Sequence, residues 1–146
     1  MKSFDLVGHC KKIEAPLARL AIFIVYFWFG ALKLLGLSPA TPLVFALFEK
    51  TLVSFVPFGI FYTLFSTFEI VIGILFLIHG LERVAIYLLA LHLITTALPL
   101  FLLPDLTWQS FLVPTMEGQY IIKNVLIAAL AVGIASKIPG KHQVNP

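Results

Sequence analysis

The chain has 146 residues, of which 60% are hydrophobic and only 12% are charged, and its formal net charge is +3. Soluble domains of this length are closer to half apolar and a quarter charged, so the mean hydropathy of +1.03 argues against a soluble fold. The single cysteine excludes a disulfide within the chain and argues against an enzyme that uses paired thiols. Four apolar segments are each long enough to cross a hydrocarbon core of about 30 Å. The composition therefore predicts one all-α, polytopic membrane protein with a four-transmembrane-helix bundle.

Residues 1–15 mix charged and apolar side chains, which is typical of a short N-terminal interfacial helix lying on the membrane surface. We expect the transmembrane domain to occupy residues 16–138 and residues 139–146 to form a polar, frayed C-terminal tail. Pro16 is expected to open the first span, over 17–37, because a proline in the first helical turn loses no hydrogen bond.

A short segment between the first two spans is expected to form a half-helix. The sequence SPATP at residues 38–42 breaks the first span. The apolar run Leu43–Phe55 is too short to cross the bilayer, and Pro57 ends it. Thr41 and Pro42 suit the N-cap and the first helical position. The half-helix is expected on the extracytoplasmic side, lying on the bundle or re-entering it. A helix lying in the interface is the alternative.

Three further spans follow in the sequence. The second is expected over Phe58–His79, and a tight polar turn at 80–83 leads to the third, over 82–103, which Pro99 should kink. A loop at 104–118 precedes the fourth span, over 119–138. Basic residues gather at the two chain ends and in the turn at 80–83, so the positive-inside rule predicts that both termini are cytoplasmic. The same rule explains the basic balance, and nucleic acid is not expected as a partner.

Glu69 lies near the middle of the second span, where an unpaired carboxylate would cost several kcal/mol to bury. An ionisable residue inside a membrane segment is a candidate functional residue. Each span carries polar or small side chains on one helical face, and these four faces should converge inside the bundle. The candidate ligand site or buried polar network consists of the polar members of these faces: Tyr26, Lys33, Tyr62, Ser66, Glu69, His92, Gln119, Lys123 and Asn124.

The depth of each residue sharpens this expectation. At ~1.5 Å of rise per residue, Glu69 and His92 both lie about 16 Å from the outer ends of their spans. On the same scale Lys33 and Lys123 lie about 6 to 8 Å deep. We therefore expect the acid and the imidazole to share a level, with both lysines above them at a mouth covered by the half-helix. Snorkelling of the lysines to water is the alternative.

Each of these residues also has a purely structural interpretation. Glu69 can belong to an ion pair that holds the helices together, and His92 can be a hydrogen-bonded core residue. Haem held by two histidines is not expected, because His79 and His92 lie at different depths. No spacing of His, Cys, Asp or Glu indicates a metal site, and no catalytic motif stands out. We do not expect the chain to be an enzyme on its own; a subunit of a quinone-linked oxidoreductase is the alternative, and no catalytic residue is assigned.

Three segments carry short sequence elements in a characteristic order. FIVYFWFGALKLLG leads from an aromatic stretch into G-x-x-K-L, FEIVIGILFLI contains E-x-x-x-G, and EGQYIIKNVLI contains G-x-x-x-x-K-N. In this order, over about residues 19–136, they resemble the DoxX-like family of small membrane proteins. The resemblance implies a compact four-helix bundle. Family members are tied to a quinone-reducing thiosulfate oxidoreductase, to oxidative-stress membrane complexes and to membrane-protein assembly.

Three functions are compatible with these observations. The first is a redox- or stress-associated membrane subunit that binds a quinone or another lipid-like ligand around Glu69, with a redox partner supplying electrons. The second is a non-catalytic scaffold or assembly module in which the buried ion pairs only lock the bundle. The third is a small proton-coupled carrier, which four spans would form only as an oligomer. The oligomeric state itself is not predicted.

Overall fold

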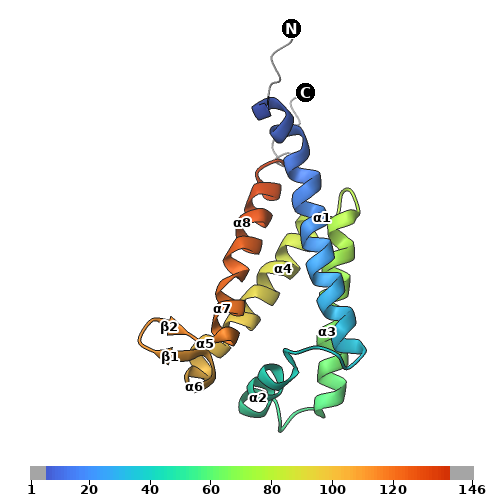
Figure 1. Cartoon of the computed structure of the whole chain (residues 1–146). Coiled ribbons are helices and arrows are strands. Elements are labelled where there is room, and N and C mark those ends of the chain that lie inside the picture. Colours follow the sequence, from blue (N-terminus) through green and yellow to red (C-terminus); the bar gives the residue numbers. More distant parts are fainter. Residues whose placement is uncertain (1–5, 139–146) are drawn as a thin grey trace, which may run out of the picture.

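The computed structural model describes residues 6–138, which are mostly helical (Figure 1). Four of its helical segments are long and apolar enough to cross a membrane: Cys10–Leu34, Phe58–Leu77, Glu82–Leu102 and Met116–Ala135. They correspond to helix α1 (Leu6–Leu34), α3 (Phe58–Leu77), α4 (Glu82–Ala97) with α5 (Pro99–Leu102), and α7 (Met116–Ile122) with α8 (Asn124–Ala135). The predicted helical class and the predicted number of candidate spans are confirmed.

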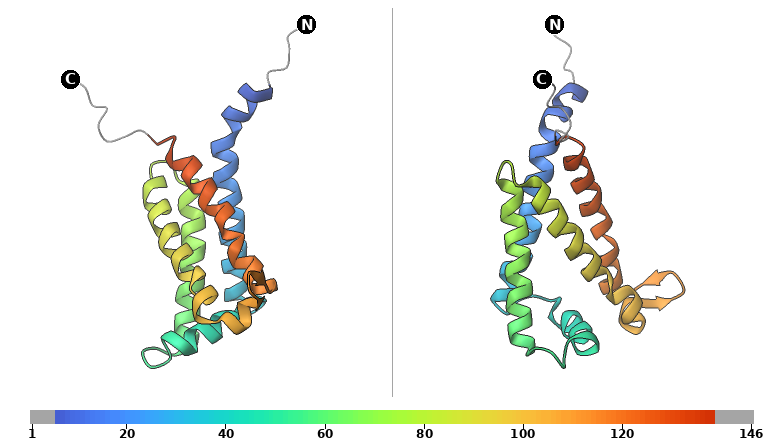
Figure 2. Two further views of the ribbon diagram at one scale, coloured as in Figure 1. Left: turned by 90° about the vertical axis from the view of Figure 1, so that its left-hand side faces the viewer. Right: turned by 180° about the vertical axis from the view of Figure 1, so that it is seen from behind.

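The helices form two pairs that meet at one end and separate at the other (Figure 2). Helices α1 and α3 lie side by side along most of their length, while α8 packs against both α1 and α4. Away from the chain termini, α4, α5 and α7 diverge from α1 and α3, and helix α2 (Thr41–Thr51) lies between the two pairs. The described ends of the chain are both at the convergent end of the bundle.

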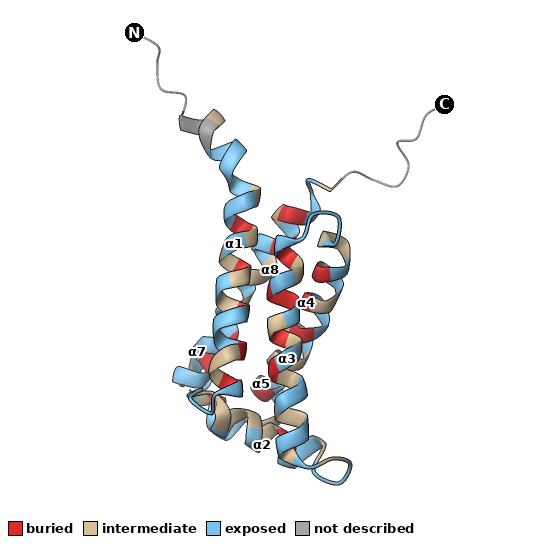
Figure 3. Cartoon of the chain, turned by 90° about the vertical axis from the view of Figure 1, so that its right-hand side faces the viewer, coloured by how far each residue is buried: buried red, intermediate tan, exposed pale blue. Residues whose placement is uncertain are grey.

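The interior of the bundle is built from one buried stripe on each span. On α1 the buried side is marked by Ala18, Ile22, Tyr26, Gly30 and Lys33, at the spacing of three or four residues that keeps side chains on one helical face. Figure 3 shows the exposed residues of the helices in pale blue, and many of the exposed side chains are large and apolar. An exterior of this kind suits contact with acyl chains and not with water.

Two glycines explain the close packing of α1 on α3. A Cβ atom added to Gly30 would lie 2.7 Å from Cγ1 of Ile70 and 2.8 Å from the carbonyl oxygen of Ser66. A Cβ added to Gly73 would lie 3.1 Å from the backbone nitrogen of Phe27. Small residues at a membrane helix interface let the two backbones approach, which increases the dispersion contacts that drive association in lipid.

The convergent end is joined by one arginine. The guanidinium of Arg19 donates from Nε to the carbonyl oxygen of Phe76 at 2.7 Å and forms an ion pair with Glu82 at 3.0 Å. Phe76 lies in the last turn of α3, where carbonyl groups lack helical partners. Arg19 therefore connects α1 to the end of α3 and to the start of α4.

Several predicted boundaries were wrong. Helix α1 runs from Leu6 to Leu34 and continues through Pro16, so no break at Pro16 separates an interfacial helix from the first span. A proline removes one hydrogen bond, and a long helix can absorb that loss by bending. Residues 1–5 and the predicted tail at 139–146 lie outside the described residues. Helix α2 is shorter than expected and is capped by Ala40, with Thr41 as its first residue.

The expected loop at 104–118 contains regular structure. It forms helix α6 (Pro104–Thr107) and an antiparallel hairpin of β1 (Trp108–Ser110) and β2 (Val113–Pro114). These elements are too short to leave a periodic pattern in the sequence. The expected interruption of the third span is present, because α4 ends at Ala97 and α5 begins at Pro99.

The glycine contact gives a test of the α1–α3 interface. Gly30→Ala should destabilise the protein by about 1–3 kcal/mol, because the added methyl overpacks against α3. Gly59→Ala is the matched control, since a Cβ at Gly59 meets no atom within 4 Å. Thermal unfolding followed by circular dichroism compares the two variants with the wild type. Equal midpoints for both variants would contradict the close-packing account.

Candidate functional site

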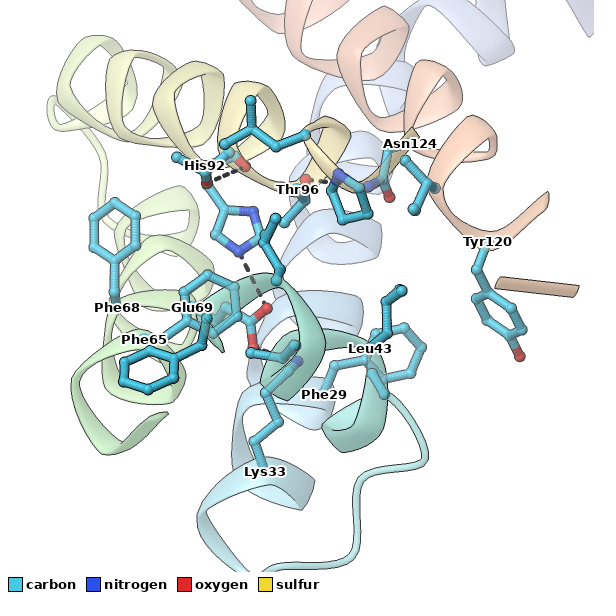
Figure 4. Close-up of a pocket in the computed structure, with 18 of the residues that line it drawn as sticks. Phe29, Lys33, Leu43, Phe65, Phe68, Glu69, His92, Thr96, Tyr120 and Asn124 are labelled. Atoms are coloured by element: carbon cyan, nitrogen blue, oxygen red, sulfur yellow. Dashed lines mark hydrogen bonds and ion pairs between the residues drawn. The ribbon is translucent and has the colours of Figure 1, made fainter. Parts of the chain in front are cut away.

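Glu69 lies at the centre of a buried network that joins three helices. Its side chain on α3 is 6% exposed, Lys33 on α1 is 7% exposed and His92 on α4 is 4% exposed. The Lys33 ammonium donates to Oε2 of Glu69 at 2.7 Å, and Nε2 of His92 lies 3.1 Å from Oε1 (Figure 4). Each carboxylate oxygen therefore has a partner from a different neighbouring helix.

Tyr26 extends this network back to α1. Its hydroxyl lies 3.1 Å from Nδ1 of His92. An ionised Glu69 can only accept hydrogen bonds, so Nε2 of His92 carries the proton and donates. In the neutral imidazole Nδ1 is then an acceptor, and the Tyr26 hydroxyl donates to it. The hydrogen bonds run from Tyr26 through His92 to Glu69, and one proton on the ring satisfies every member.

The network borders a cavity of about 520 Å³ between the two diverging helix pairs, which we call the bundle cavity. Most of its walls are apolar. Phe65 stacks on His92 with ring centroids 5.2 Å apart, and Val44 and Leu47 of α2 form another wall. Thr95, Thr96 and Asn124 add polar groups. The cavity is therefore amphipathic: a small polar patch faces an otherwise apolar space.

Asn124 and Thr96 lie at the cavity's α4–α8 side (Figure 4). The side-chain amide of Asn124 donates to the hydroxyl of Thr96 at 3.4 Å. This contact links the start of α8 to α4. Asn124 thus lies at the bundle cavity, although no hydrogen bond joins it to Glu69.

Two predicted residues on α3 are part of the bundle but not of the cavity wall. Ser66 is buried, and its hydroxyl donates to the carbonyl oxygen of Tyr62 at 2.6 Å. The hydroxyl of Tyr62 lies 2.6 Å from that of Thr41, the first residue of α2. The contact between Thr41 and Tyr62 fixes α2 against α3 at the divergent end.

The expected pair of lysines at one mouth does not form. Lys123 is exposed, does not line the cavity and places its ammonium 5.4 Å from the ring centroid of Tyr120. Gln119 is also exposed and lies outside the cavity. Gln119 and Lys123 are one turn apart and share an exposed face of the fourth span. Gly118 and Ile121 take the buried face of α7 instead.

The sequence interpretation missed the aromatic wall. Phe61, Phe65 and Phe68 follow each other at helical spacing on α3, and Phe65 is one turn before Glu69. That spacing could have indicated rings beside the carboxylate. No sequence pattern indicated that α2 lines the cavity, because the position of α2 depends on how the loop at 35–40 folds back.

Within residues 6–138 no group of three or more His, Cys, Asp or Glu side chains could hold a metal ion. Comparisons with models of protein families, with curated proteins and with solved structures give no match for this chain. The site is therefore interpreted from its own geometry.

The buried ion pair gives a second test. Lys33→Met leaves the Glu69 carboxylate without its cation, and Glu69→Gln leaves the ammonium without its anion, so each should cost about 3–5 kcal/mol of unfolding free energy. The double variant K33M/E69Q buries no unpaired charge and should recover most of that loss. Urea or thermal unfolding of the four proteins completes the cycle.

The exposed ion pair between Lys137 and Glu14 is the control, since its side chains are 38% and 55% exposed. Lys137→Met should change stability by less than about 1 kcal/mol. Additive losses in the double variant K33M/E69Q would show that the two buried residues do not act as a pair.

Proposed function

We propose that this protein is an integral membrane protein that binds a quinone or another lipid-like ligand in the bundle cavity around Glu69. The observation that carries this proposal is the amphipathic cavity: a compact group of hydrogen-bonding side chains borders an apolar space. Its volume of about 520 Å³ lies within the roughly 300–1,000 Å³ of typical small-molecule sites.

The rim of the cavity supports a ligand that arrives from the bilayer. Phe29 on α1, Leu91 on α4 and Tyr120 on α7 line the cavity and are exposed. All three belong to segments that are long and apolar enough to span a membrane. A molecule dissolved in the hydrocarbon layer reaches such a rim without passing through water.

The polar patch has the chemistry to hold a carbonyl-bearing head. The Lys33 ammonium has three N–H donors and uses one on Glu69, so another can polarise a ligand oxygen. The hydrogen-bonded chain of Tyr26, His92 and Glu69 can hold and pass a proton. Electron transfer is the part that a separate redox protein would supply.

We also propose that the chain is a member of the DoxX-like family that it resembles. Its proposed location is the cell membrane, with both termini on the cytoplasmic side. What supports the orientation is the excess of Lys and Arg near the chain ends and in the turn at 80–83. In that orientation the divergent end of the bundle, with α2 and the hairpin, faces the extracytoplasmic side.

A second candidate function is a scaffold or assembly module without a ligand. It is favoured by the complete pairing of Glu69, since both carboxylate oxygens already have partners in the bundle. Under this alternative the buried network only fixes the order of the helices. The two functions differ in whether a small apolar molecule stabilises the folded protein.

A decyl-tailed benzoquinone should raise the midpoint of thermal unfolding of the protein in lipid nanodiscs, because a ligand that binds only the folded state stabilises it. Val44→Trp should reduce this shift, since residue 44 lines the cavity and the larger ring fills it. Val125→Trp is the control: residue 125 is 67% exposed and lies outside the cavity. A quinone shift that is absent, or equal in all three proteins, would favour the scaffold.

A further inference from the structure

We propose that the bundle cavity selects ligands by head-group charge: it takes an uncharged, carbonyl-bearing head and rejects an anionic one. This inference rests on the ligand-binding function proposed above and specifies its ligand class. It separates a neutral ketone, quinone or ester from a fatty acid carboxylate or a lipid phosphate, all of which have apolar tails that suit the same walls.

The charged side chains that line the cavity balance each other. Among the described residues that line it, Lys33 and Glu69 are the only Lys, Arg, Asp or Glu side chains. Their charged atoms are 2.7 Å apart, and both side chains are 7% exposed. His92 satisfies its two partners with a single ring proton. With a neutral His92 ring, the patch that meets a ligand head has no net charge.

A charged ligand head would disturb the ion pair between Lys33 and Glu69. An anionic head binds well only by taking Lys33 as its partner, which sets a second negative charge beside the Glu69 carboxylate. Like charges in a buried site repel strongly, because little water is present to screen them. A cationic head meets the corresponding problem with Lys33. The ion pair therefore disfavours charged heads of either sign.

A neutral ligand head can gain a hydrogen bond without disturbing the ion pair. A carbonyl oxygen can accept from a second N–H group of Lys33 while the first remains on Glu69, so no buried partner is lost. Phe65 lies on one side of the Lys33 ammonium, with its ring centroid 5.8 Å from Nζ. An aromatic ring therefore borders the position that a neutral head would occupy. Figure 4 shows Lys33, Glu69 and His92 facing the space between Phe65 and Leu43.

Two ligands of matched tail test this selectivity. Tritiated 2-tridecanone has a neutral carbonyl, and tritiated laurate, at a pH that ionises it, has an anionic head. Saturation binding to the full chain in zwitterionic nanodiscs, with empty nanodiscs subtracted, gives both affinities. We expect the wild type to prefer the ketone by at least about tenfold, equivalent to 1.4 kcal/mol.

Glu69→Gln should reverse the preference, because it leaves Lys33 as an unpaired cation in the cavity. The double variant K33M/E69Q, again without net charge, should lose the affinity for laurate that E69Q gained. Lys137→Met removes a lysine from an exposed ion pair outside the cavity and should leave the wild-type ratio unchanged. A purely structural role of Glu69 would alter folding without reversing a binding ratio.

The outcomes separate this inference from the proposed function. If the wild type binds neither compound nor the quinone, the ligand-binding function itself fails. If the wild type binds laurate as well as or better than the ketone, ligand binding stands and charge selection is overturned. Should E69Q fail to fold, as circular dichroism would show, the wild-type ratio decides the question, since charge selection requires the wild type to favour the ketone.

Discussion

The contact between Lys33 and Glu69 is the constraint on which the rest of the structure depends. A carboxylate in an apolar segment has to find a cation or a donor inside the bundle, since lipid offers neither. Lys33 meets that need from α1, and His92 meets it from α4. The three helices are therefore fixed in rotation and in depth relative to each other. Glycines at the α1–α3 contact allow the lysine and the acid to approach within 2.7 Å.

The contact between Lys33 and Glu69 holds the helices together at one level of the bundle, and other contacts hold them at its two ends. At the convergent end, Arg19 joins α1 to the end of α3 and to the start of α4, and α8 packs against α1 and α4. At the divergent end the spans separate, and α2 lies between them. Helix α2 is held there by the contact between Thr41 and Tyr62. Lys50 also donates to the carbonyl oxygen of Leu102 at 2.6 Å. The cavity is a result of this geometry: it lies where the helices part, and the buried network forms its polar border.

Much of this arrangement could be predicted from the sequence. Apolar runs of about 20 residues gave the four candidate spans, and helical spacing placed Tyr26, Lys33, Glu69 and His92 on inward faces. Equal depth brought Glu69 and His92 together. The place of Lys123 was predicted wrongly, because the spacing argument took the polar side chains of the fourth span as its buried face, whereas Gly118 and Ile121 mark that face. The hairpin at 108–114 and the fold of α2 over the cavity depend on tertiary contacts, which local patterns do not encode.

The ion pair between α1 and α3 also has a consequence for biogenesis. A lysine or an acid at the centre of a lone helix costs roughly 2.5–3.5 kcal/mol to insert. Glu69 lies in the middle of α3 and Lys33 in the last turn of α1, so insertion of α3 alone exposes an uncompensated carboxylate to acyl chains. Partition of α1, α2 and α3 as one helical hairpin neutralises both charges on the way in. The pair thus favours co-insertion of the first half of the chain over stepwise entry of single helices.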